Sequence, residues 1–301
     1  MASASPHTLK SHSRIKLIQD LFIHLRLHFQ LLLAPIFLWG YFLAGQRPNR
    51  DFWLAFLAFH VFLYGGITAF NSYYDRDEGP VGGLANPPPV TKALLPFSLV
   101  ILGLGVLLAV LVNLSFLTIY LLISGMGLAY SYPGIRLKSR PLGGLVTVGL
   151  GQGILAGLGG WVAAAPLTLL DSLSWLGILA MTFITVGFYP LTQIYQIEED
   201  LARGDLTFAA WVGPKGVFRF AISLQGLAAL LLVGVVAQLL GWINALVVAI
   251  VYGILATATI YWARTFDETR ILENYRRIML INTVSSLGFM GFVGLHLFNV
   301  L

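Results

Sequence analysis

The sequence predicts an all-α, polytopic membrane protein that crosses the bilayer nine times. Composition is the first observation behind this class: 57% of the 301 residues are hydrophobic, only 10% are charged, and the mean hydropathy is +0.82. In soluble domains, charged residues usually make up roughly a quarter of the chain. The second observation is that apolar runs near the length of a bilayer-spanning helix, about 20 residues, recur along the chain. Glycine is also abundant, with 32 residues, which suits helices that pack closely without water.

The N-terminal region is polar before it becomes apolar. Residues 1–13 show neither the apolar core nor the small-residue cleavage site of a signal peptide, so we expect a disordered tail. Residues 15–27 form an amphipathic entry to the first span. We expect their charged side chains, Lys16, Asp20 and Arg26, to stay in the membrane interface.

Turn-forming residues separate the apolar runs. Glycine and proline are too dense in residues 79–89 for a helix to continue, so this segment is either a loop that covers a site or a simple linker. Asn113 joins two spans tightly, and the Gly-Pro-Lys-Gly sequence of residues 213–216 marks the turn into another. The predicted spans are residues 28–45, 52–73, 92–112, 114–130, 142–165, 175–195, 217–240, 242–263 and 278–300.

The distribution of basic residues predicts how the chain is oriented. With nine spans, the N-terminal region and the loops after the even-numbered spans share one side, which holds all but Arg47 and Arg50 of the 18 Lys and Arg residues. Cytoplasmic loops carry such an excess. We therefore expect a cytoplasmic tail with an interfacial segment over residues 1–27, a nine-helix domain over residues 28–301, and a C-terminus on the opposite side. Orientation also accounts for the net charge of +5 without a nucleic-acid partner.

Two acidic clusters end predicted spans on this cytoplasmic side. Residues 71–78 read Asn-Ser-Tyr-Tyr-Asp-Arg-Asp-Glu, and residues 196–200 read Gln-Ile-Glu-Glu-Asp, with a further acid at Asp205. The whole chain has only 13 Asp and Glu residues. Acids beside membrane-length segments are costly and therefore suggest function. The alternative is that both clusters are ordinary helix ends whose charges are solvated at the interface.

The residue types in these clusters suit a magnesium diphosphate. Side chains four positions apart lie on the same face of a helix. We therefore expect Asn71 and Asp75 to point to the same side, and likewise Gln196 and Asp200. Magnesium usually takes one or two carboxylates, with phosphate oxygens and water in its remaining positions. The chain has no cysteine, which excludes thiolate catalysis and thiolate metal sites. Basic side chains able to donate to diphosphate oxygens are Arg76, Arg136, Lys138, Arg140 and Arg203.

Three segments resemble motifs of the UbiA superfamily of intramembrane prenyltransferases. Residues 71–76 look like its first acidic motif, N-D-x-x-D-x-x-x-D. Residues 130–138, Tyr-Ser-Tyr-Pro-Gly-Ile-Arg-Leu-Lys, resemble the basic loop after its fourth helix. Residues 196–200, followed by Gly204-Asp205 and Thr207, resemble the second motif, D-x-x-x-D. The resemblance covers nearly the whole chain, with the motifs in the family's order.

The resemblance implies nine helices bundled around a central cavity, where Mg²⁺ bridges both acidic motifs and a prenyl diphosphate donor. Ionisation of the donor gives a carbocation, which aromatic faces stabilise and a lipophilic or aromatic acceptor attacks. The implied catalytic residues are Asn71, Asp75, Lys138 and Asp200. The implied metal ligands are Asn71, Asp75, Asp77, Glu199 and Asp200. The implied substrate-binding residues are Tyr74, Arg76, Tyr130, Arg136, Lys138, Arg140, Tyr195 and Gln196.

The sequence departs from the motifs at three positions. Ser72 stands where the family often has aspartate, Gly79 where the last aspartate of the first motif would fall, and Gln196 in place of the first acid of the second motif. The neighbouring acids Asp77, Glu78, Glu198 and Glu199 could compensate, although on an ideal helix they do not share the face of Asp75 or Asp200. The number of Mg²⁺ ions stays open.

Two other functions stay open as well. A UbiA-type terpene cyclase would ionise the same donor but close the cation on its own chain. A small-molecule or lipid transporter is the alternative from another class, because polytopic bundles with intramembrane charge often transport. Against a transporter, the sequence shows no pair of broken spans at mid-membrane depth. For Arg136, Lys138 and Arg140, the alternative is that they only orient the chain or contact anionic membrane lipids.

Overall fold

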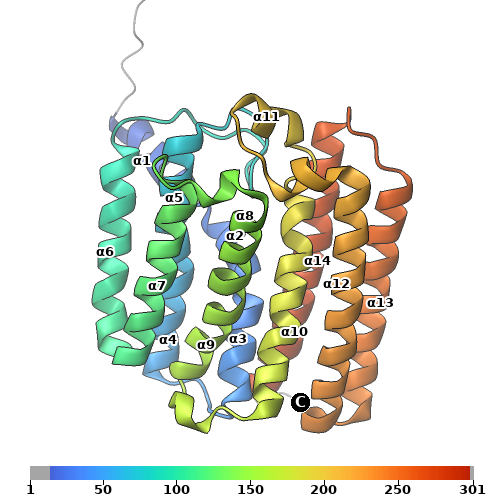
Figure 1. Cartoon of the computed structure of the whole chain (residues 1–301). Helices are drawn as coiled ribbons and strands as arrows, with labels where there is room; N and C mark the ends of the chain where they lie inside the picture. The colour runs from blue at the N-terminus through green and yellow to red at the C-terminus, as the bar shows by residue number, and fades with distance from the viewer. Residues whose placement is uncertain (1–13, 299–301) are drawn as a thin grey trace, which may run out of the picture.

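The computed structural model of the chain describes residues 14–298. The predictions for the tail of residues 1–13, the last residues of the ninth span and the C-terminus lie outside these residues. Within them, nine helices are long and apolar enough to cross a membrane, and β-structure is limited to an isolated bridge between Val81 and Leu84. The predicted all-α fold with nine spans is confirmed, and Figure 1 shows the spans standing side by side in one bundle.

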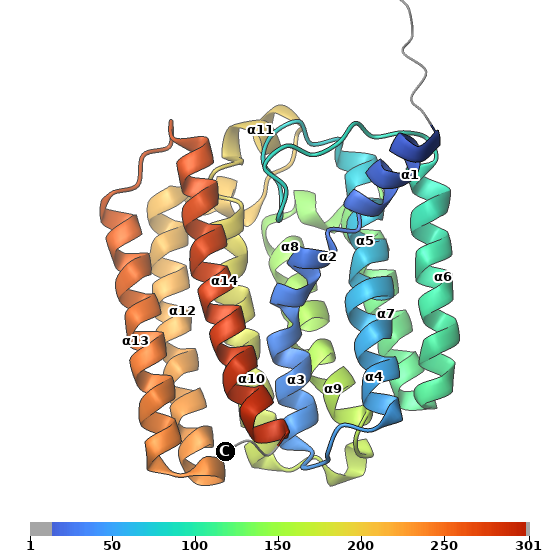
Figure 2. The ribbon, with the colours of Figure 1, turned by 180° about the vertical axis from the view of Figure 1, so that it is seen from behind.

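The first span is broken near one end. Arg26 separates α1 (Arg14–Ile23) from α2 (Leu27–Gln30), which runs through the 3₁₀ turn η1 (Leu31–Leu33) into α3 (Ala34–Leu43). The backbone of Arg26 is left-handed, with φ of 50°, a conformation that residues other than glycine adopt rarely. As a result, α1 tilts away from α2 and α3 in Figure 2.

Two charged side chains near this break are buried within the protein. Asp20 is 8% exposed and Arg26 is 4% exposed, whereas the expectation that these charges lie at the level of the membrane interface stays a prediction. The left-handed turn at Arg26 redirects the chain and points the arginine into the bundle, which an uninterrupted amphipathic helix would not do.

The second span also contains a π-helical turn. It comprises α4 (Arg50–Leu57), the π turn η2 (Ala58–Leu63) and α5 (Tyr64–Asp75). A second π turn, η4, interrupts the fifth span. The remaining elements are α6 (Leu94–Val112), α7 (Leu114–Ser131), η3 (Leu137–Ser139), α8 (Pro141–Val148), η4 (Gly149–Leu155), α9 (Ala156–Val162), η5 (Leu167–Leu169), α10 (Ser172–Phe188), η6 (Tyr189–Thr192), α11 (Ile197–Ala202), α12 (Phe208–Leu240), α13 (Trp242–Arg264) and α14 (Ile271–Leu297).

Short polar side chains begin several of these helices. The side chain of Asn113 accepts a hydrogen bond from Phe116 N at 2.9 Å and so starts α7 one residue after α6 ends. Asp171 caps α10 through Ser174 N at 2.7 Å. Such caps satisfy backbone donors that the first helical turn leaves free. The tight joint predicted at Asn113 is confirmed.

Three boundaries differ from the sequence prediction. α12 begins at Phe208, and the predicted turn is only a kink within it at Gly213, where φ is 67°. α14 begins at Ile271, because the helix continues beyond its apolar stretch into the polar end of the bundle. The sixth span does not run into the second acidic cluster; α10 ends at Phe188, and the cluster occupies the separate short helix α11.

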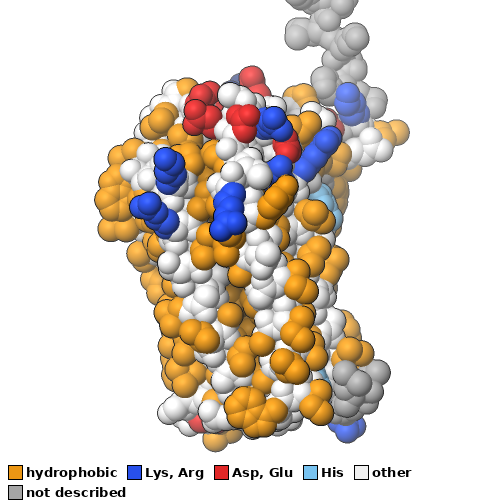
Figure 3. Space-filling model, turned by 90° about the vertical axis from the view of Figure 1, so that its right-hand side faces the viewer, with side chains coloured by type: hydrophobic (Ala, Val, Ile, Leu, Met, Phe, Trp, Pro, Cys, Tyr) orange, Lys and Arg blue, Asp and Glu red, His pale blue; other side chains and the backbone are white. Residues whose placement is uncertain are grey.

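Close helix contacts hold the bundle together. A Cβ on Gly40 would lie 1.9 Å from the carbonyl oxygen of Gly157, and one on Gly160 would lie 2.0 Å from that of Phe37, so α3 and α9 pack backbone to backbone as the glycine-rich fifth span predicts. The last helix closes on the first span, where Ser286 Oγ donates to Leu32 O at 2.9 Å. Hydrophobic side chains cover the flank below a charged end in Figure 3, as expected where helices face lipid.

Candidate functional site

A cavity of about 310 Å³ lies inside the bundle. Asp75 from the first acidic cluster and Asp200 from the second both line it, as the sequence predicts for helix ends that share one side. All charged side chains that line the cavity lie near these two acids, among the described residues. We call this set the charged mouth: Arg26, Asp75, Asp77, Lys138, Asp200, Arg203 and Asp205.

The end of α5 brings the first acidic cluster to the cavity. Asn71 and Asp75 lie one helical turn apart, and Asn71 Nδ2 donates to Ser131 Oγ on α7 at 2.8 Å. Asp75 pairs with Lys138. The helix ends because Arg76 is left-handed, with φ of 51°, and this turn returns the chain over the cavity. Asp77 therefore reaches the mouth from the loop and not from the helix face that carries Asp75.

Arg203 joins the two acidic clusters. Its Nη1 donates to Asp77 Oδ1 at 2.7 Å and to Glu199 Oε1 at 3.0 Å, and its Nη2 donates to Asp200 Oδ1 at 2.8 Å. Burial lowers the pKa of Arg203, but the neighbouring Asp77 and Asp200 carboxylates raise it more, so the net shift is upward. Burial raises the pKa of Asp200 to about 6, and its hydrogen bond to Arg203 opposes this rise. One cation thus holds carboxylates from both clusters together.

The basic loop after α7 supplies further cations. Arg136 Nε and Nη2 donate to the two oxygens of Asp205, each at 2.7 Å, a bidentate geometry that arginine forms readily with carboxylates. These hydrogen bonds raise the pKa of Arg136. Its Nη2 also lies 3.6 Å from Asp75 Oδ1. Because Lys138 pairs with the same carboxylate, this loop connects the first acidic cluster with Asp205.

The charged mouth fits a divalent cation that shares its ligands with a phosphate group. Asp75 Oδ1 and Asp77 Oδ2 are buried and accept no hydrogen bond from any described residue. Residues 14–298 nevertheless contain no group of three acidic or histidine side chains that could hold a metal by itself, and Lys138 and Arg203 pair with the carboxylates. Oxygen donors that do not complete a cage suit Mg²⁺, which keeps water and phosphate oxygens in its coordination shell.

Arg26 is a mouth residue that the sequence analysis missed. Its Nη2 donates to Ser72 Oγ at 2.8 Å, while its buried Nε has no hydrogen-bond partner. Among the described residues, no carboxylate pairs directly with it. Ser72 is the position where the motif often carries aspartate, so this arginine lacks the counter-ion that an acid there could provide. The signal in the sequence that could have identified Arg26 was a single arginine beside an apolar stretch, because a charge in such a place is costly and suggests function.

The loop after α5 covers the cavity. Its residues Val81 and Gly82 line the cavity wall. A ring nitrogen of His28 lies 2.8 Å from Gly83 O on one side, and Gln196 Nε2 donates to Pro80 O at 3.0 Å on the other. Of the two readings of this segment, the structure therefore favours a cover over a simple linker.

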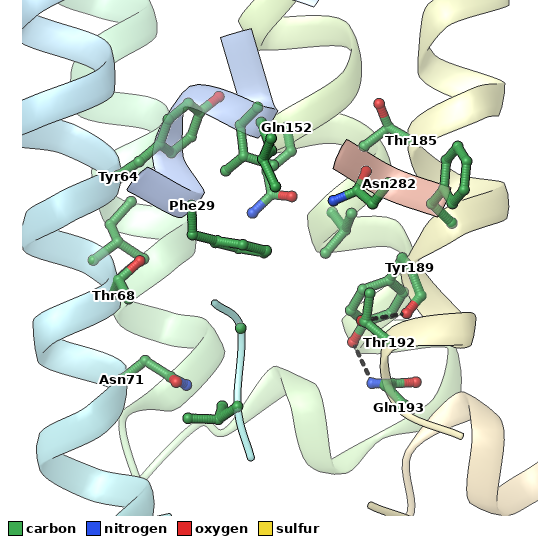
Figure 4. Close-up of a pocket in the computed structure, with 18 of the residues that line it drawn as sticks. Phe29, Tyr64, Thr68, Asn71, Gln152, Thr185, Tyr189, Thr192, Gln193 and Asn282 are labelled. Carbon is green, nitrogen blue, oxygen red and sulfur yellow. Dashed lines mark hydrogen bonds between the residues drawn. The ribbon is translucent and has the colours of Figure 1, made fainter. Parts of the chain in front are cut away.

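Tyrosines lie beneath the charged mouth. The hydroxyl groups of Tyr130 and Tyr189 are 3.0 Å apart. Gln193 Nε2 donates to Tyr189 Oη at 2.8 Å, and Figure 4 shows these two side chains together. Tyr195 also lines the cavity, and its ring packs against Tyr275 with centroids 5.6 Å apart. Aromatic faces are thus available directly inside the charged groups.

Most residues singled out from the sequence meet at this cavity. Arg136 and Glu199 pair with mouth residues. Three others do not line the cavity: Arg76 is exposed, Arg140 precedes α8, and the ring of Tyr74 packs against Tyr132 with centroids 6.0 Å apart. The predicted residues that line it are Asn71, Asp75, Asp77, Tyr130, Lys138, Tyr195, Gln196 and Asp200.

Comparisons with known proteins point to one family. Residues 33–284 match the profile of the UbiA prenyltransferase family. The chain is 32% identical over 176 residues to the digeranylgeranylglyceryl phosphate synthase of Methanothrix thermoacetophila, covering 57% of this chain and 62% of that protein. It is 29% identical over 150 residues to the protoheme IX farnesyltransferase of Aeropyrum pernix, covering 48% and 49%. With the 4-hydroxybenzoate octaprenyltransferase of Pseudomonas fluorescens it shares 30% identity over 227 residues, covering 71% and 72%.

Solved structures share the fold. A UbiA homolog from Archaeoglobus fulgidus, bound to GPP and Mg²⁺, superposes with a TM-score of 0.64 at 17% identity, covering 91% of this chain and 99% of that chain. The apo structure of a UbiA homolog from Aeropyrum pernix superposes with a TM-score of 0.65 at 22% identity, covering 88% and 98%. At these identities the likeness concerns the arrangement of the helices.

Proposed function

Because the chain belongs to the UbiA prenyltransferase family, we propose that it is an Mg²⁺-dependent intramembrane prenyltransferase. It transfers an isoprenoid chain from a prenyl diphosphate to a lipophilic or aromatic acceptor. The observation that carries this proposal is the meeting of Asp75 and Asp200 at one cavity, with Lys138 and Arg203 beside them. The homolog from Archaeoglobus fulgidus that has this fold was solved with GPP or DMAPP together with Mg²⁺, which supports the same donor class and metal here.

In this proposal the charged mouth holds the diphosphate. Asp75, Asp77 and Asp200 would hold Mg²⁺, assisted by Asn71 and Glu199. When bound, Mg²⁺ withdraws electron density from the diphosphate and stabilises it as a leaving group. Lys138, Arg203 and Arg26 donate hydrogen bonds to diphosphate oxygens, which lowers the barrier by neutralising charge that develops there. Arg26 is suited to this role because its buried Nε has no hydrogen-bond partner among the described residues.

The reaction then takes place below the mouth. The bond between C1 and the diphosphate oxygen breaks, and both electrons leave with the diphosphate. An electron pair of the acceptor forms the new bond to C1, and the acceptor releases a proton, which the departing diphosphate takes up. The faces of Tyr130, Tyr189 and Tyr195 line this part of the cavity and stabilise the cation. The loop over residues 77–93 keeps water away, because its Val81 and Gly82 close the wall.

The unit that performs this chemistry includes the segment before the first full span. Residues 28–301 alone would omit Arg26, so we place residues 14–27 with the catalytic domain. The excess of basic residues at the end that carries the mouth supports a cytoplasmic position for it. The N-terminus then faces the cytoplasm, and the C-terminus faces the opposite side.

Product analysis tests the proposed function. The purified protein in lipid nanodiscs is incubated with Mg²⁺ and geranyl, farnesyl or geranylgeranyl diphosphate, with and without a panel of acceptors, and diphosphate release is measured. Release that depends on an acceptor and yields a prenylated product supports transfer. A cyclised hydrocarbon from the donor alone would identify a terpene cyclase instead. Substrate uptake by reconstituted vesicles without diphosphate release would identify a transporter.

A further inference from the structure

The inner end of the cavity carries a layer of uncharged polar side chains. We call Tyr64 on α5, Gln152 on η4, Thr185 on α10 and Asn282 on α14 the polar layer, and all four line the cavity. Figure 4 shows them at one level, with Phe29 between them and Asn71. Tyr64 precedes Asp75 by a stretch of α5 that rises about 16 Å at 1.5 Å per residue. The layer therefore lies near mid-depth of a hydrocarbon core about 30 Å thick.

Most of this layer has no partner within the protein. The hydroxyl group of Tyr64 is buried, on a residue only 3% exposed, and makes no hydrogen bond with any described residue. Gln152 is half-buried, and its amide makes no hydrogen bond with any described residue. The amide oxygen of Asn282 receives one long contact of 3.5 Å from Ser286, and its amide nitrogen has no acceptor. Buried polar groups are normally satisfied, so this layer is suited to a ligand that donates and accepts hydrogen bonds.

A prenyl tail would not satisfy these groups. Its hydrocarbon neither donates nor accepts hydrogen bonds, and covering the layer with it would leave amide and hydroxyl groups desolvated and unpaired. The tail is better suited to the apolar wall. The polar layer therefore belongs to the acceptor, which must approach C1 of the donor from inside the mouth.

The layer also contains no charge that could balance an ionised acceptor. Within residues 14–298, the cations that line the cavity are those of the charged mouth: Lys138 pairs with Asp75, Arg203 pairs with Asp77 and Asp200, and Arg26 donates to Ser72. A carboxylate or phosphate at mid-membrane depth would lie unpaired in a medium of low dielectric constant, which is very costly.

On the basis of the proposed function, we infer that the acceptor is an uncharged hydroxy-aromatic ring, bound by Tyr64, Gln152 and Asn282, and that acceptors bearing a carboxylate or phosphate on the ring are rejected. Amide and hydroxyl groups can each donate to and accept from ring hydroxyls. The ring hydroxyls also make the ring electron-rich enough to attack a carbocation. The π turn η4 that carries Gln152 agrees with this role, since such turns are frequent at functional sites.

A matched pair of acceptors tests this inference in the unaltered protein. Naphthohydroquinone and its carboxylated counterpart, dihydroxynaphthoate, share one ring system and differ by a single anionic group. With Mg²⁺ and a saturating prenyl diphosphate, we expect kcat/KM for the uncharged ring to exceed that for the carboxylated ring by at least about tenfold. Prenylated product and released diphosphate are measured in the same reactions.

Variants of the polar layer test the assigned residues. Gln152→Leu and Asn282→Leu should each raise KM for naphthohydroquinone about three- to tenfold, the usual effect of losing one hydrogen bond. Gln225→Leu is the matched control, because this glutamine is buried on α12 with an unpartnered Nε2 but does not line the cavity. It should keep the KM of the unaltered protein.

The outcomes separate this inference from the function on which it rests. Equal efficiency with both rings, or transfer to neither ring while diphosphate is still released, overturns the acceptor class and leaves the prenyl diphosphate chemistry standing. A preference for the carboxylated ring that disappears in Arg26→Gln would assign the acceptor's anion to Arg26 and also overturn it. Absence of diphosphate release under every condition would instead refute the proposed function.

Discussion

At the charged mouth, every carboxylate is already paired with a cation, whereas most side chains of the polar layer are uncharged groups that lack a good hydrogen-bond partner. Lys138 lies against Asp75 and Arg203 bridges Asp77 and Asp200, while the buried hydroxyl group of Tyr64 has no described partner. Under the proposed function, the difference teaches how one cavity would bind two substrates. The mouth would exchange internal ion pairs for an ionic ligand, whereas the inner end would only form new hydrogen bonds. Variants at the mouth should therefore have the larger effects.

The largest effect is expected from the acids that both clusters contribute. Asp75→Ala and Asp200→Ala should each lower the rate of diphosphate release at least about 100-fold, because each removes a metal ligand and leaves a buried cation unpaired. Release of diphosphate from a prenyl diphosphate, with Mg²⁺ present, measures this. Glu198→Ala is the control, since Glu198 is exposed on the same short helix. Unchanged release in both aspartate variants would contradict the assignment of the mouth.

Arg26 should have the next largest effect. Arg26→Gln should raise KM for the prenyl diphosphate about 10- to 50-fold, the range expected for losing a charge-assisted hydrogen bond, and Arg26→Lys should recover part of the loss. The measurement is the dependence of diphosphate release on donor concentration. Arg276→Gln serves as control because Arg276 is an exposed arginine of α14. A normal donor KM in Arg26→Gln would return this residue to a purely structural role.

Arg203 should give opposite effects on two measurements. In the absence of donor it neutralises Asp77 and Asp200 and so competes with a metal ion. Arg203→Gln should raise the affinity for Mn²⁺, titrated by electron paramagnetic resonance as a substitute for Mg²⁺, about three- to tenfold, while turnover falls. Weaker Mn²⁺ binding in this variant would show that the ion pairs assemble the metal ligands and do not compete for them.

The smallest effect is expected at the loop after α5 that covers the cavity. Gln196→Leu removes the hydrogen bond to Pro80 O and should slow product formation about two- to fivefold through a less well-held loop, consistent with a bond worth about 1 kcal/mol. Gln238→Leu, an exposed position on α12, is the matched control. A loss as large as that of the aspartate variants would instead assign Gln196 to the metal or the diphosphate.

Hydropathy was sufficient to predict the number of spans, because a bilayer requires a long apolar run wherever a helix crosses it. The resemblance to UbiA motifs is confirmed by the family match over residues 33–284. Boundaries were less predictable where helices continue past the apolar core, as α12 and α14 do.

Part of the site was predictable because a helix face determines direction, and part because residues 130–138 and 196–200 resemble family motifs. Asn71 and Asp75 share a face of α5 and both reach the cavity. Arg26 and Asp77 were not predictable in the same way, because left-handed residues at positions 26 and 76 redirect the backbone. Tyr74 lies next to a predicted ligand in the sequence yet points toward Tyr132, so closeness along the chain did not decide which side chains meet.

The hydrogen bond from Ser286 on α14 to Leu32 in the first span joins the last membrane-spanning helix of the bundle to the first. No half of the molecule can therefore form the chamber alone, because the wall between its first and last spans is missing until both are present. A chain cut between α7 and α8 and expressed as two fragments should be inactive when either fragment is alone. Activity should return only when the fragments reassociate in one membrane.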